Sequence, residues 1–411
     1  MKKLLVLFVA LVMAFAALPA FAQDKADWAF YGQVRMWTAW ESVKAETPAI
    51  LTGTGGAPFL GQYGYQGYAN AQRWLKADGN YEGDAGLAWE LQGNSRIGAN
   101  VKWGNIGGRF EYGSAPNLRL LYGTWNFGAG TLLVGQDYTP WFYLVSNLCG
   151  PGGGECNGIG FGSIYGGRQP QLKLIFGGFN VALVRPYNQA SLYTINPLAT
   201  TADNLFAAVP AADVDREWPK FEASYSLTAG PVALWMGGAY QKVTYVTTSL
   251  ANLTNDVDVD SWQLGLGARM AFGPFYLNST ATYAKNPNNY NVYADLLPTF
   301  SLVDATAQNQ ENAGYWSFQL IPGFKVTDSL SFEGGIILQT SKINVPSSSP
   351  EVELKQTSWV YYIQMTWSPA KNVYIIPELG VIDYKQLQIT DDDDVDLGKT
   401  TWFGIKWQIN F

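Results

Sequence analysis

The chain ends in the residues Thr400-Thr401-Trp402-Phe403-Gly404-Ile405-Lys406-Trp407-Gln408-Ile409-Asn410-Phe411. Counted back from the C-terminus, every second residue is apolar: Phe411, Ile409, Trp407, Ile405 and Phe403. The residues between them are Asn410, Gln408, Lys406 and Gly404. Alternation with a period of two is typical of a β-strand with one apolar and one polar face. The end of the chain is therefore predicted to be a strand.

Segments 359–367 and 262–272 repeat this alternation. Their apolar faces carry Trp359, Tyr361, Ile363, Met365 and Trp367 in the first segment, and Trp262, Leu264, Leu266, Ala268, Met270 and Phe272 in the second. A half-buried sheet of a soluble sandwich would alternate in the same way. Here, however, Trp, Tyr and Phe lie near both ends of the apolar faces, which is typical of the aromatic girdles of outer-membrane barrels.

The connections between the predicted strands alternate between short and long. The predicted strands are 28–42, 85–103, 106–114, 118–127, 131–138, 170–178, 179–187, 218–228, 232–247, 260–272, 274–285, 314–325, 330–345, 355–368, 372–390 and 398–411. Short links such as 128–130 alternate with long ones such as 139–169, and only the link at 115–117 is short where a long one is expected. Backbone groups in lipid must all be paired, so such a sheet has to close. The predicted fold class is all-β, an antiparallel up-and-down transmembrane β-barrel of about 16 strands.

The composition excludes several classes of function. The formal net charge is -7, whereas a nucleic-acid-binding protein needs a basic surface. The sequence has no histidine, which excludes serine–histidine triads and histidine metal sites. Charged residues make up 14% of the chain, against about 25% in an ordinary soluble domain. We therefore expect no enzyme, no cofactor or metal site, no nucleic-acid partner, and a surface that faces lipid.

The first 22 residues are organised like a secretory signal peptide. Lys2 and Lys3 precede an apolar run from Leu4 to Leu18, and Ala20-Phe21-Ala22 follows as a small-x-small cleavage site. The apolar run is shorter than the ~20 residues that a membrane-spanning helix needs. We expect cleavage after Ala22, export of the chain, and one barrel domain over residues 23–411.

Four segments and the last residue form an ordered set of motifs. They are Phe30-Tyr31-Gly32-Gln33-Val34-Arg35, Asn94-Ser95-Arg96-Ile97-Gly98, Gly107-Gly108-Arg109-Phe110-Glu111-Tyr112-Gly113, Gly130-Thr131-Leu132-Leu133-Val134-Gly135-Gln136-Asp137, and Phe411. This set resembles that of the Gram-negative general porins. The resemblance implies a sixteen-stranded barrel, a homotrimer among the lipid and lipopolysaccharide of the outer membrane, and passive diffusion of small hydrophilic solutes.

The resemblance also implies roles for particular segments. The third outer loop, residues 139–169, would fold into the lumen and narrow it. Phe411 would be the assembly signal that the outer-membrane insertion machinery reads. The chain departs from the family at the second outer loop, which often latches onto a neighbouring subunit but is only about Ala115-Pro116-Asn117 here.

Cys149 and Cys156 are the two cysteines of the chain, and both lie in the third loop. Because an exported chain is oxidised, we expect them to form a disulfide. It would contribute roughly 2–3 kcal/mol and stiffen the glycine-rich segment 150–154. A metal site would need more ligands than these two residues supply, and a reactive thiol pair is the remaining alternative.

Charged residues of the strands are predicted to face the lumen, because a charge facing the lipid midplane costs about 2–4 kcal/mol. Arg35, Arg96, Arg109 and Arg119 lie on four consecutive predicted strands and would form a basic patch that lines the pore with Lys173. Asp137 and Glu155 would face this patch across the constriction. Opposed charges would orient solutes and give a weak anion preference.

Solvated lumen charge without selectivity is the alternative. The predicted inward-facing set also contains Glu90, Lys102, Glu111, Lys220, Glu222, Arg269, Glu333, Glu378 and Lys406.

Two further points remain open from the sequence. A substrate-selective channel, with Trp141, Phe142 and Tyr143 as an aromatic track, is an alternative to passive diffusion, and a plugged adhesive barrel is a third reading. The acidic run Asp391 to Asp394 could hold Ca²⁺ or bridge lipopolysaccharide through divalent cations. A solvated, self-repelling loop explains that run equally well.

Overall fold

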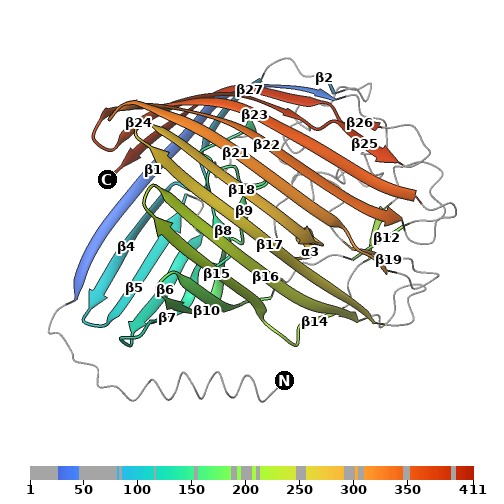
Figure 1. Ribbon diagram of the computed structural model, residues 1–411, viewed down its shortest axis with the longest axis horizontal. Coiled ribbons are helices and arrows are strands. Elements are labelled where there is room, and N and C mark those ends of the chain that lie inside the picture. Colours follow the sequence, from blue (N-terminus) through green and yellow to red (C-terminus); the bar gives the residue numbers. More distant parts are fainter. Residues whose placement is uncertain are drawn as a thin grey trace.

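The first and last strands of the chain pair with each other and close the sheet into a barrel in the computed structural model (Figure 1). The antiparallel register between β1 (Asp27–Ala45) and β27 (Lys399–Asn410) runs from Gln33 opposite Asn410 to Lys44 opposite Lys399. Phe411 extends the closure, because its N–H donates to the carbonyl of Gly32 at 2.9 Å and its carbonyl accepts from the N–H of Gly32 at 2.7 Å. The pairing therefore runs without a break along the seam from Gly32 and Phe411 to Lys44 and Lys399, and closes the sheet as a membrane barrel requires.

The structure describes residues 26–45, 81–82, 86–114, 117–151, 156–186, 192–195, 206–209, 213–246, 256–290, 301–303, 310–345, 352–389 and 395–411. Within these residues the wall has sixteen strands, each antiparallel to its neighbours. In order after β1 they are β3 (Gly86–Leu91) continued by β4 (Arg96–Trp103), β5 (Ile106–Gly113), β6 (Leu118–Asn126), β7 (Thr131–Tyr138), β10 (Arg168–Phe176), β11 (Phe179–Val184), β15 (Lys220–Ala229), β16 (Val232–Val246), β17 (Val257–Phe272), β18 (Phe275–Lys285), β21 (Gly314–Thr327), β22 (Leu330–Val345), β23 (Val352–Ala370), β24 (Val373–Asp383) and β27.

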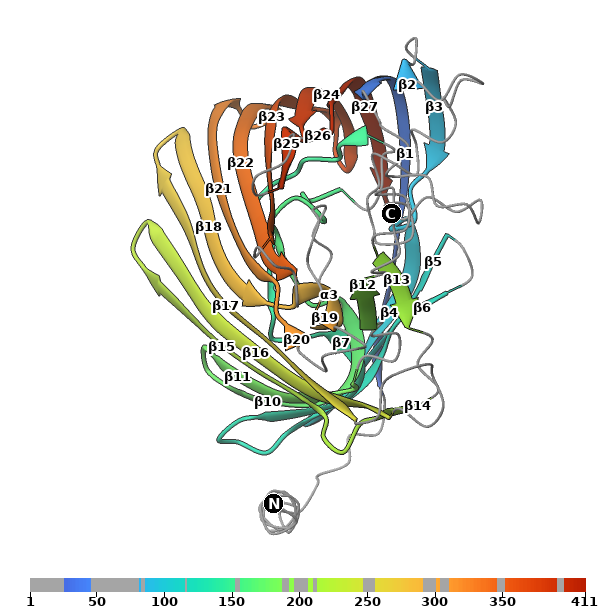
Figure 2. The same cartoon turned by 90° about the vertical axis from the view of Figure 1, so that its right-hand side faces the viewer.

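Shorter elements lie in the loops. β2 (Tyr81–Glu82) extends the outer end of β1, and β14 (Asp213–Asp215) pairs with β16. β25 (Gln386–Ile389) pairs with β23 and with β26 (Val395–Asp396). Inside the barrel, β8 (Phe142–Tyr143) pairs with β9 (Ile164–Tyr165), and α3 (Pro287–Tyr290) forms one short helix (Figure 2). A separate sheet joins two loops through β12 (Leu192–Ile195), β13 (Phe206–Val209), β19 (Leu302–Val303) and β20 (Gln310–Glu311).

The two faces of the wall differ as the alternation in the sequence predicts. Leu264, Leu266 and Ile363 are 58%, 60% and 64% exposed on the outer face. Gln263 and Gln364, their neighbours in sequence, are buried on the inner face. Exposed aromatic residues mark both ends of the apolar band, for example Phe272, Phe275 and Phe179 beside the short turns and Tyr240, Tyr283 and Trp316 toward the long loops. The outer surface is therefore an apolar band between two aromatic girdles, the pattern of a membrane-facing barrel.

All sixteen predicted strands are confirmed, with two differences in detail. The predicted strand 85–103 is interrupted, because two residues of β1 (Val34 and Arg35) face the four residues 92–95 between β3 and β4. The predicted strand 372–390 ends at Asp383, and residues 386–389 form the separate strand β25, which continues along β23 beyond the end of β24. The interruption at 92–95 pushes chain into the lumen and becomes part of the site.

Among the described residues there is no helix with both the length and the apolar character needed to cross a bilayer. The predicted signal peptide, residues 1–22, lies outside the described residues.

Candidate functional site

The loop between β7 and β10 lies inside the barrel, in agreement with the resemblance, and runs along the wall (Figure 2). Its outgoing limb passes β15, where the N–H of Trp141 donates to Glu222, and then β18, where Asn278 donates to the carbonyl of Val145. The returning limb passes β21, where Gln319 donates to the carbonyl of Phe161 at 2.6 Å. We call residues 139–167 the lumen loop.

Three buried glutamates of the wall hold the outgoing limb by its backbone. Glu222 accepts from the N–H of Trp141 at 2.8 Å, and Glu333 accepts from the N–H of Asn147 at 2.9 Å and from its side-chain amide at 3.0 Å. Glu378 accepts from the N–H groups of Cys149 and Gly150, both at 2.9 Å. Charge-assisted hydrogen bonds in a buried setting are stronger than neutral ones, so these carboxylates fix the position of the limb.

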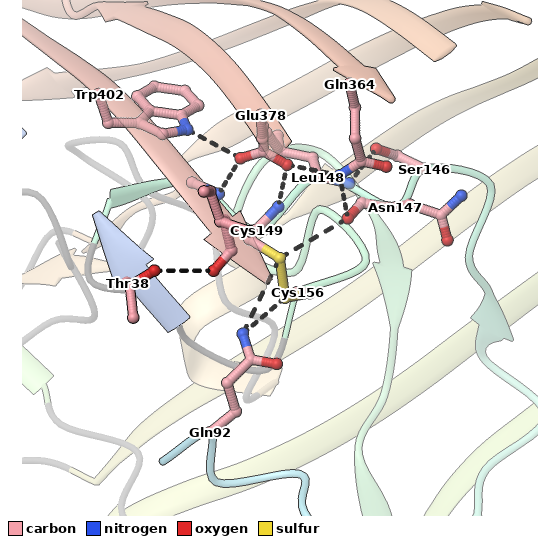
Figure 3. Close-up of a disulfide and its surroundings, with 12 residues drawn as sticks. Thr38, Gln92, Ser146, Asn147, Leu148, Cys149, Cys156, Gln364, Glu378 and Trp402 are labelled. Atoms are coloured by element: carbon pink, nitrogen blue, oxygen red, sulfur yellow. Dashed lines mark hydrogen bonds between the residues drawn. A yellow bond between two sulfur atoms is a disulfide. The ribbon is translucent and has the colours of Figure 1, made fainter. Parts of the chain in front are cut away.

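Glu378 has the most complete set of partners (Figure 3). Besides the two loop N–H groups, its oxygens accept from the indole N–H of Trp402 at 2.8 Å and from the amide of Gln364 at 2.7 Å. Four donors therefore converge on one carboxylate that is 1% exposed. The predicted lumen-facing acids Glu222, Glu333 and Glu378 thus serve as anchors beneath the lumen loop.

Aromatic side chains of the lumen loop fit against glycines of the inner wall. A Cβ at Gly267 would lie 2.3 Å from the ring of Tyr143, and a Cβ at Gly265 would lie 2.8 Å from the ring of Trp141. Tyr143 also stacks on Trp235 of β16, with ring centroids 5.5 Å apart and an interplanar angle of 18°. Only glycine at 265 and 267 allows this close approach, which explains two inward glycines in the middle of a strand.

The disulfide between Cys149 and Cys156 is present, as predicted, at the far end of the lumen loop. It lies against the interruption between β3 and β4, where the side-chain amide of Gln92 is 2.9 Å from the sulfur of Cys156 (Figure 3). The same end of the loop is bound to Glu378 on β24. The disulfide therefore lies where the loop contacts both Glu378 of β24 and Gln92, the residue that follows β3. At this point the loop bridges two separate parts of the inner wall.

The predicted basic patch assembles on one carboxylate. Arg96, Arg109 and Arg119 lie on the adjacent strands β4, β5 and β6, and their guanidinium groups are 3.6, 3.0 and 2.7 Å from Glu111. Tyr31 of β1 also donates to Glu111, at 2.8 Å, and the guanidinium of Arg109 lies over its ring. We call these five residues the arginine cluster. Its carboxylate is fully buried, whereas the Arg96 and Arg109 side chains are 17% and 31% exposed.

Other predicted pore-lining residues occupy different settings. Arg119 was predicted to line the pore, but its side chain is 1% exposed. It donates to the buried carboxylate of Glu111 at 2.7 Å. Arg35 of β1 is half-buried and adjoins the interruption at 92–95, where its N–H donates to Ser95. Lys173 is 8% exposed and forms an ion pair of 2.6 Å with Asp137. Of the two acids expected to face the patch, Asp137 is the one paired with Lys173, and Glu155 lies outside the described residues.

A second loop also enters the lumen, which the sequence did not predict. Tyr290 of α3 is 1% exposed, donates to Glu222 at 2.7 Å, and accepts from Lys220 through its carbonyl. Lys220 and Glu222 are therefore covered and do not line an open passage. An isolated Tyr290 in a polar segment gave no periodic pattern that could have placed it inside the barrel.

The aromatic and acidic residues predicted as further candidates differ in burial and in their partners. Of the proposed aromatic track, Trp141 is fully buried against Trp235, whereas Phe142 and Tyr143 line a cavity of ≈ 1020 Å³. Asp258 pairs with Lys242 at 2.6 Å, and Asp260 accepts from Tyr240 at 2.7 Å. In the described part of the chain no group of acidic residues is arranged to hold a metal, and Asp391 to Asp394 lie outside it.

Comparison with known proteins agrees with this architecture. No family model and no curated protein matches the chain. Among solved structures, the outer membrane channel DcaP of Acinetobacter baumannii is 15% identical over 96% of this chain and 100% of its own, with a TM-score of 0.60. The outer-membrane-expressed OmpT of Vibrio cholerae is 13% identical over 96% of this chain and 100% of its own, with a TM-score of 0.54.

The chain has the fold of these outer-membrane proteins. At 13–15% identity the likeness concerns the fold alone. In this fold the lumen loop is the segment predicted as the third outer loop, and the short second loop follows Gly113 of β5. The predicted barrel and its strand number are confirmed by the sixteen-stranded wall, while the roles of individual residues rest on the geometry described above.

Proposed function

We propose that this chain is an outer-membrane channel through which small hydrophilic solutes and ions diffuse passively. The observation that carries the proposal is a closed barrel with an apolar outer band, a charged inner wall, and a loop strapped along that wall. A lumen lined by polar side chains is the setting in which water and solutes cross a membrane barrel. The barrel domain would be residues 23–411, released from a signal peptide of residues 1–22.

The proposed location is the outer membrane of a Gram-negative bacterium, with lipid and lipopolysaccharide around the apolar band. Phe411 is 67% exposed on the outer face beside Gly32, which suits a terminal residue read by the insertion machinery. Deleting Phe411 should leave the chain exported but poorly inserted. Equal amounts of heat-modifiable barrel from the full-length and shortened chains would contradict this role.

A homotrimer is the proposed assembly. One of the similar structures, an in-vitro folded OmpT of Vibrio cholerae, is described as a trimer form; it is 14% identical, covers 94% of this chain and 100% of its own, and has a TM-score of 0.53. The short loop after β5 means that a trimer of this chain would depend on contacts between the apolar bands. Cross-linking of the detergent-solubilised protein, with monomer as the contradicting result, tests this.

The distribution of lumen charge favours a weak preference for anions. The acids Glu111, Glu222, Glu333 and Glu378 are 0–6% exposed and bonded to the wall or the lumen loop. The side chains of Arg96 and Arg109, on the inner wall, stay 17% and 31% exposed. In about 0.1 M salt the Debye length is about 10 Å, so these charges act on passing ions more than charges at the mouth do.

Planar-bilayer recording of the full chain tests the proposal. A salt gradient should give stable single-channel steps and a reversal potential with the sign of weak anion preference. The preference should drift toward cations as the salt concentration falls, because acidic outer loops are then less screened. A barrel without conductance would contradict the channel and favour a plugged, adhesive barrel. A strong cation preference at high salt would show that Glu155 or Asp137 dominates the constriction.

A substrate-selective channel is the second candidate. The observation that favours it is the exposure of Phe142 and Tyr143 to the ≈ 1020 Å³ cavity, although the third member of the expected track, Trp141, is buried. Competition between solutes in conductance traces separates selective from unselective diffusion.

A further inference from the structure

A cavity of ≈ 1020 Å³ lies between the lumen loop and the end of the barrel that carries the short turns. Gly230 and Pro231 of one turn and Gly273 and Pro274 of the next line it at that end. At the other end it is lined by the outgoing limb from Tyr138 to Asn147. Sites for small molecules measure roughly 300–1000 Å³, so this space can hold one solute on its way through.

Positive charge in this cavity is only partly compensated. Arg269 and Lys325 are exposed within it, and in the described part of the chain no carboxylate lies within the 4.0 Å of an ion pair from either. Arg269 donates to the carbonyl of Leu144, which uses one of its several N–H groups. The two other cations of the lining, Arg96 and Lys173, already have Glu111 and Asp137 as partners.

The one carboxylate among the described lining residues is already occupied. Glu333 accepts from both nitrogens of Asn147, from Tyr362 at 2.7 Å and from Tyr276 at 3.2 Å. It is 6% exposed and is held by the lumen loop. The cavity therefore has a net attraction for anions that comes chiefly from Arg269 and Lys325.

Flat apolar surface lies directly beside Arg269 and lines the same cavity as Lys325. The guanidinium of Arg269 is 5.1 Å from the centroid of the Tyr143 ring, whose neighbour is the stacked Trp235. Phe142 contributes a second, half-buried ring, 4.5 Å from that of Tyr138. An inorganic anion would use only the cations, and a neutral sugar would use only the rings and amides. An aromatic carboxylate uses both.

We infer that this cavity is a binding site for small aromatic carboxylates, with Arg269 and Lys325 recognising the carboxylate and Phe142 and Tyr143 contacting the ring. The inference rests on the proposed channel function and gives it a substrate class. The solute would dwell in the cavity before it leaves past the short turns. An occupied cavity would then obstruct the flow of small ions, which makes binding visible as a loss of current.

The test uses the purified full chain in planar bilayers in about 0.1 M KCl, where charges remain effective over about 10 Å. Benzoate is compared with acetate, which has the charge without the ring, and with benzamide, which has the ring without the charge. Benzoate should reduce the single-channel current at a concentration about tenfold lower than either comparison solute, since each lacks one of the two contacts. Equal effects of the three solutes would overturn the site while leaving the channel intact.

Matched variants assign the effect to the cavity. Lys325→Gln should raise the half-blocking concentration of benzoate several-fold, whereas Lys371→Gln, at another exposed short turn outside the lining, should not change it. Arg269→Gln should raise it further, and Arg269→Lys, which keeps the charge, should restore part of the block. Indistinguishable block in Lys325→Gln and Lys371→Gln would overturn the assignment.

Calorimetry on the detergent-solubilised chain separates the two proposals. Heat of benzoate binding that is lost in Arg269→Gln supports the site whether or not the barrel conducts. Binding without conductance would overturn the channel alone, and conductance without benzoate binding would overturn the site alone.

Discussion

The two sides of the inner wall use charged residues differently. On the side from β15 to β24, single carboxylates such as Glu378 bind backbone N–H groups of the lumen loop and are removed from the lumen. On the side from β1 to β6, Arg96, Arg109 and Arg119 gather around Glu111, and the Arg96 and Arg109 side chains stay partly exposed. We therefore expect changes on the anchoring side to act mainly on the width of the passage, and changes on the arginine side to act mainly on ion preference.

The comparison predicts that changes on the anchoring side have the largest effect. Glu378→Ala leaves the N–H groups of Cys149 and Gly150 and the indole of Trp402 without their acceptor, and each buried unsatisfied group costs about 1–3 kcal/mol. The loop should detach, so single-channel conductance should rise several-fold and thermal stability should fall. Glu353→Gln, in an exposed pair with Lys342, is the control and should leave conductance unchanged. Wild-type conductance in Glu378→Ala would show that other contacts suffice.

A second test displaces a side chain of the lumen loop without changing any charge. Gly267→Ala places a methyl group 2.3 Å from the ring of Tyr143, so the ring must move, at a cost of about 1–3 kcal/mol for overpacking. We expect a lower melting temperature and an altered conductance with unchanged ion preference. Gly314→Ala, where the nearest atom is 3.9 Å away, is the matched control. A change in ion preference in Gly267→Ala would mean that the two sides are not separable.

Changes on the arginine side should alter ion preference and little else. Arg35→Ala combined with Arg96→Ala removes two partly buried cations of the inner wall, so the reversal potential in a salt gradient should approach that of an unselective pore. Expression and conductance should stay close to those of the wild type, because Arg109 and Arg119 still compensate Glu111. A reversal potential equal to the wild-type value would refute the assignment of selectivity to this side.

The smallest effect is expected from the disulfide. Cys149→Ser with Cys156→Ser removes a cross-link worth roughly 2–3 kcal/mol in the chain-entropy model, yet the backbone of the loop remains bound to Glu378 and Glu333. Single-channel current should become noisier, or slightly larger, with the barrel intact. Traces that match the wild type under oxidising and reducing conditions would show that hydrogen bonds alone hold the loop. If the double cysteine variant changed conductance more than Glu378→Ala does, the disulfide and not Glu378 would be the stronger anchor of the lumen loop.

The barrel could be predicted from local sequence patterns. The local patterns are alternation along each strand, aromatic residues at both strand ends and connections of unequal length. Because lipid surrounds the barrel and water fills it, the apolar residues of each strand must face outward and the polar ones inward. That is why all sixteen strands, the outward position of Phe411 and the pairing of Cys149 with Cys156 could be predicted.

The contacts of the inward-facing residues could not be predicted from the sequence. Parity places Glu111, Glu222 and Glu378 in the lumen, but whether a carboxylate lines a pore depends on which segment covers it. That segment comes from 68 to 229 residues away in the contacts of Glu222 and Glu378. Gly265 and Gly267 alternate with the apolar residues of segment 262–272, but no sequence pattern connects them with their partners Trp141 and Tyr143. The packing of loops against the wall joins residues far apart in the chain and leaves no periodic pattern in the sequence. The existence of a constriction could therefore be predicted, but the residues that contact each other in it could not.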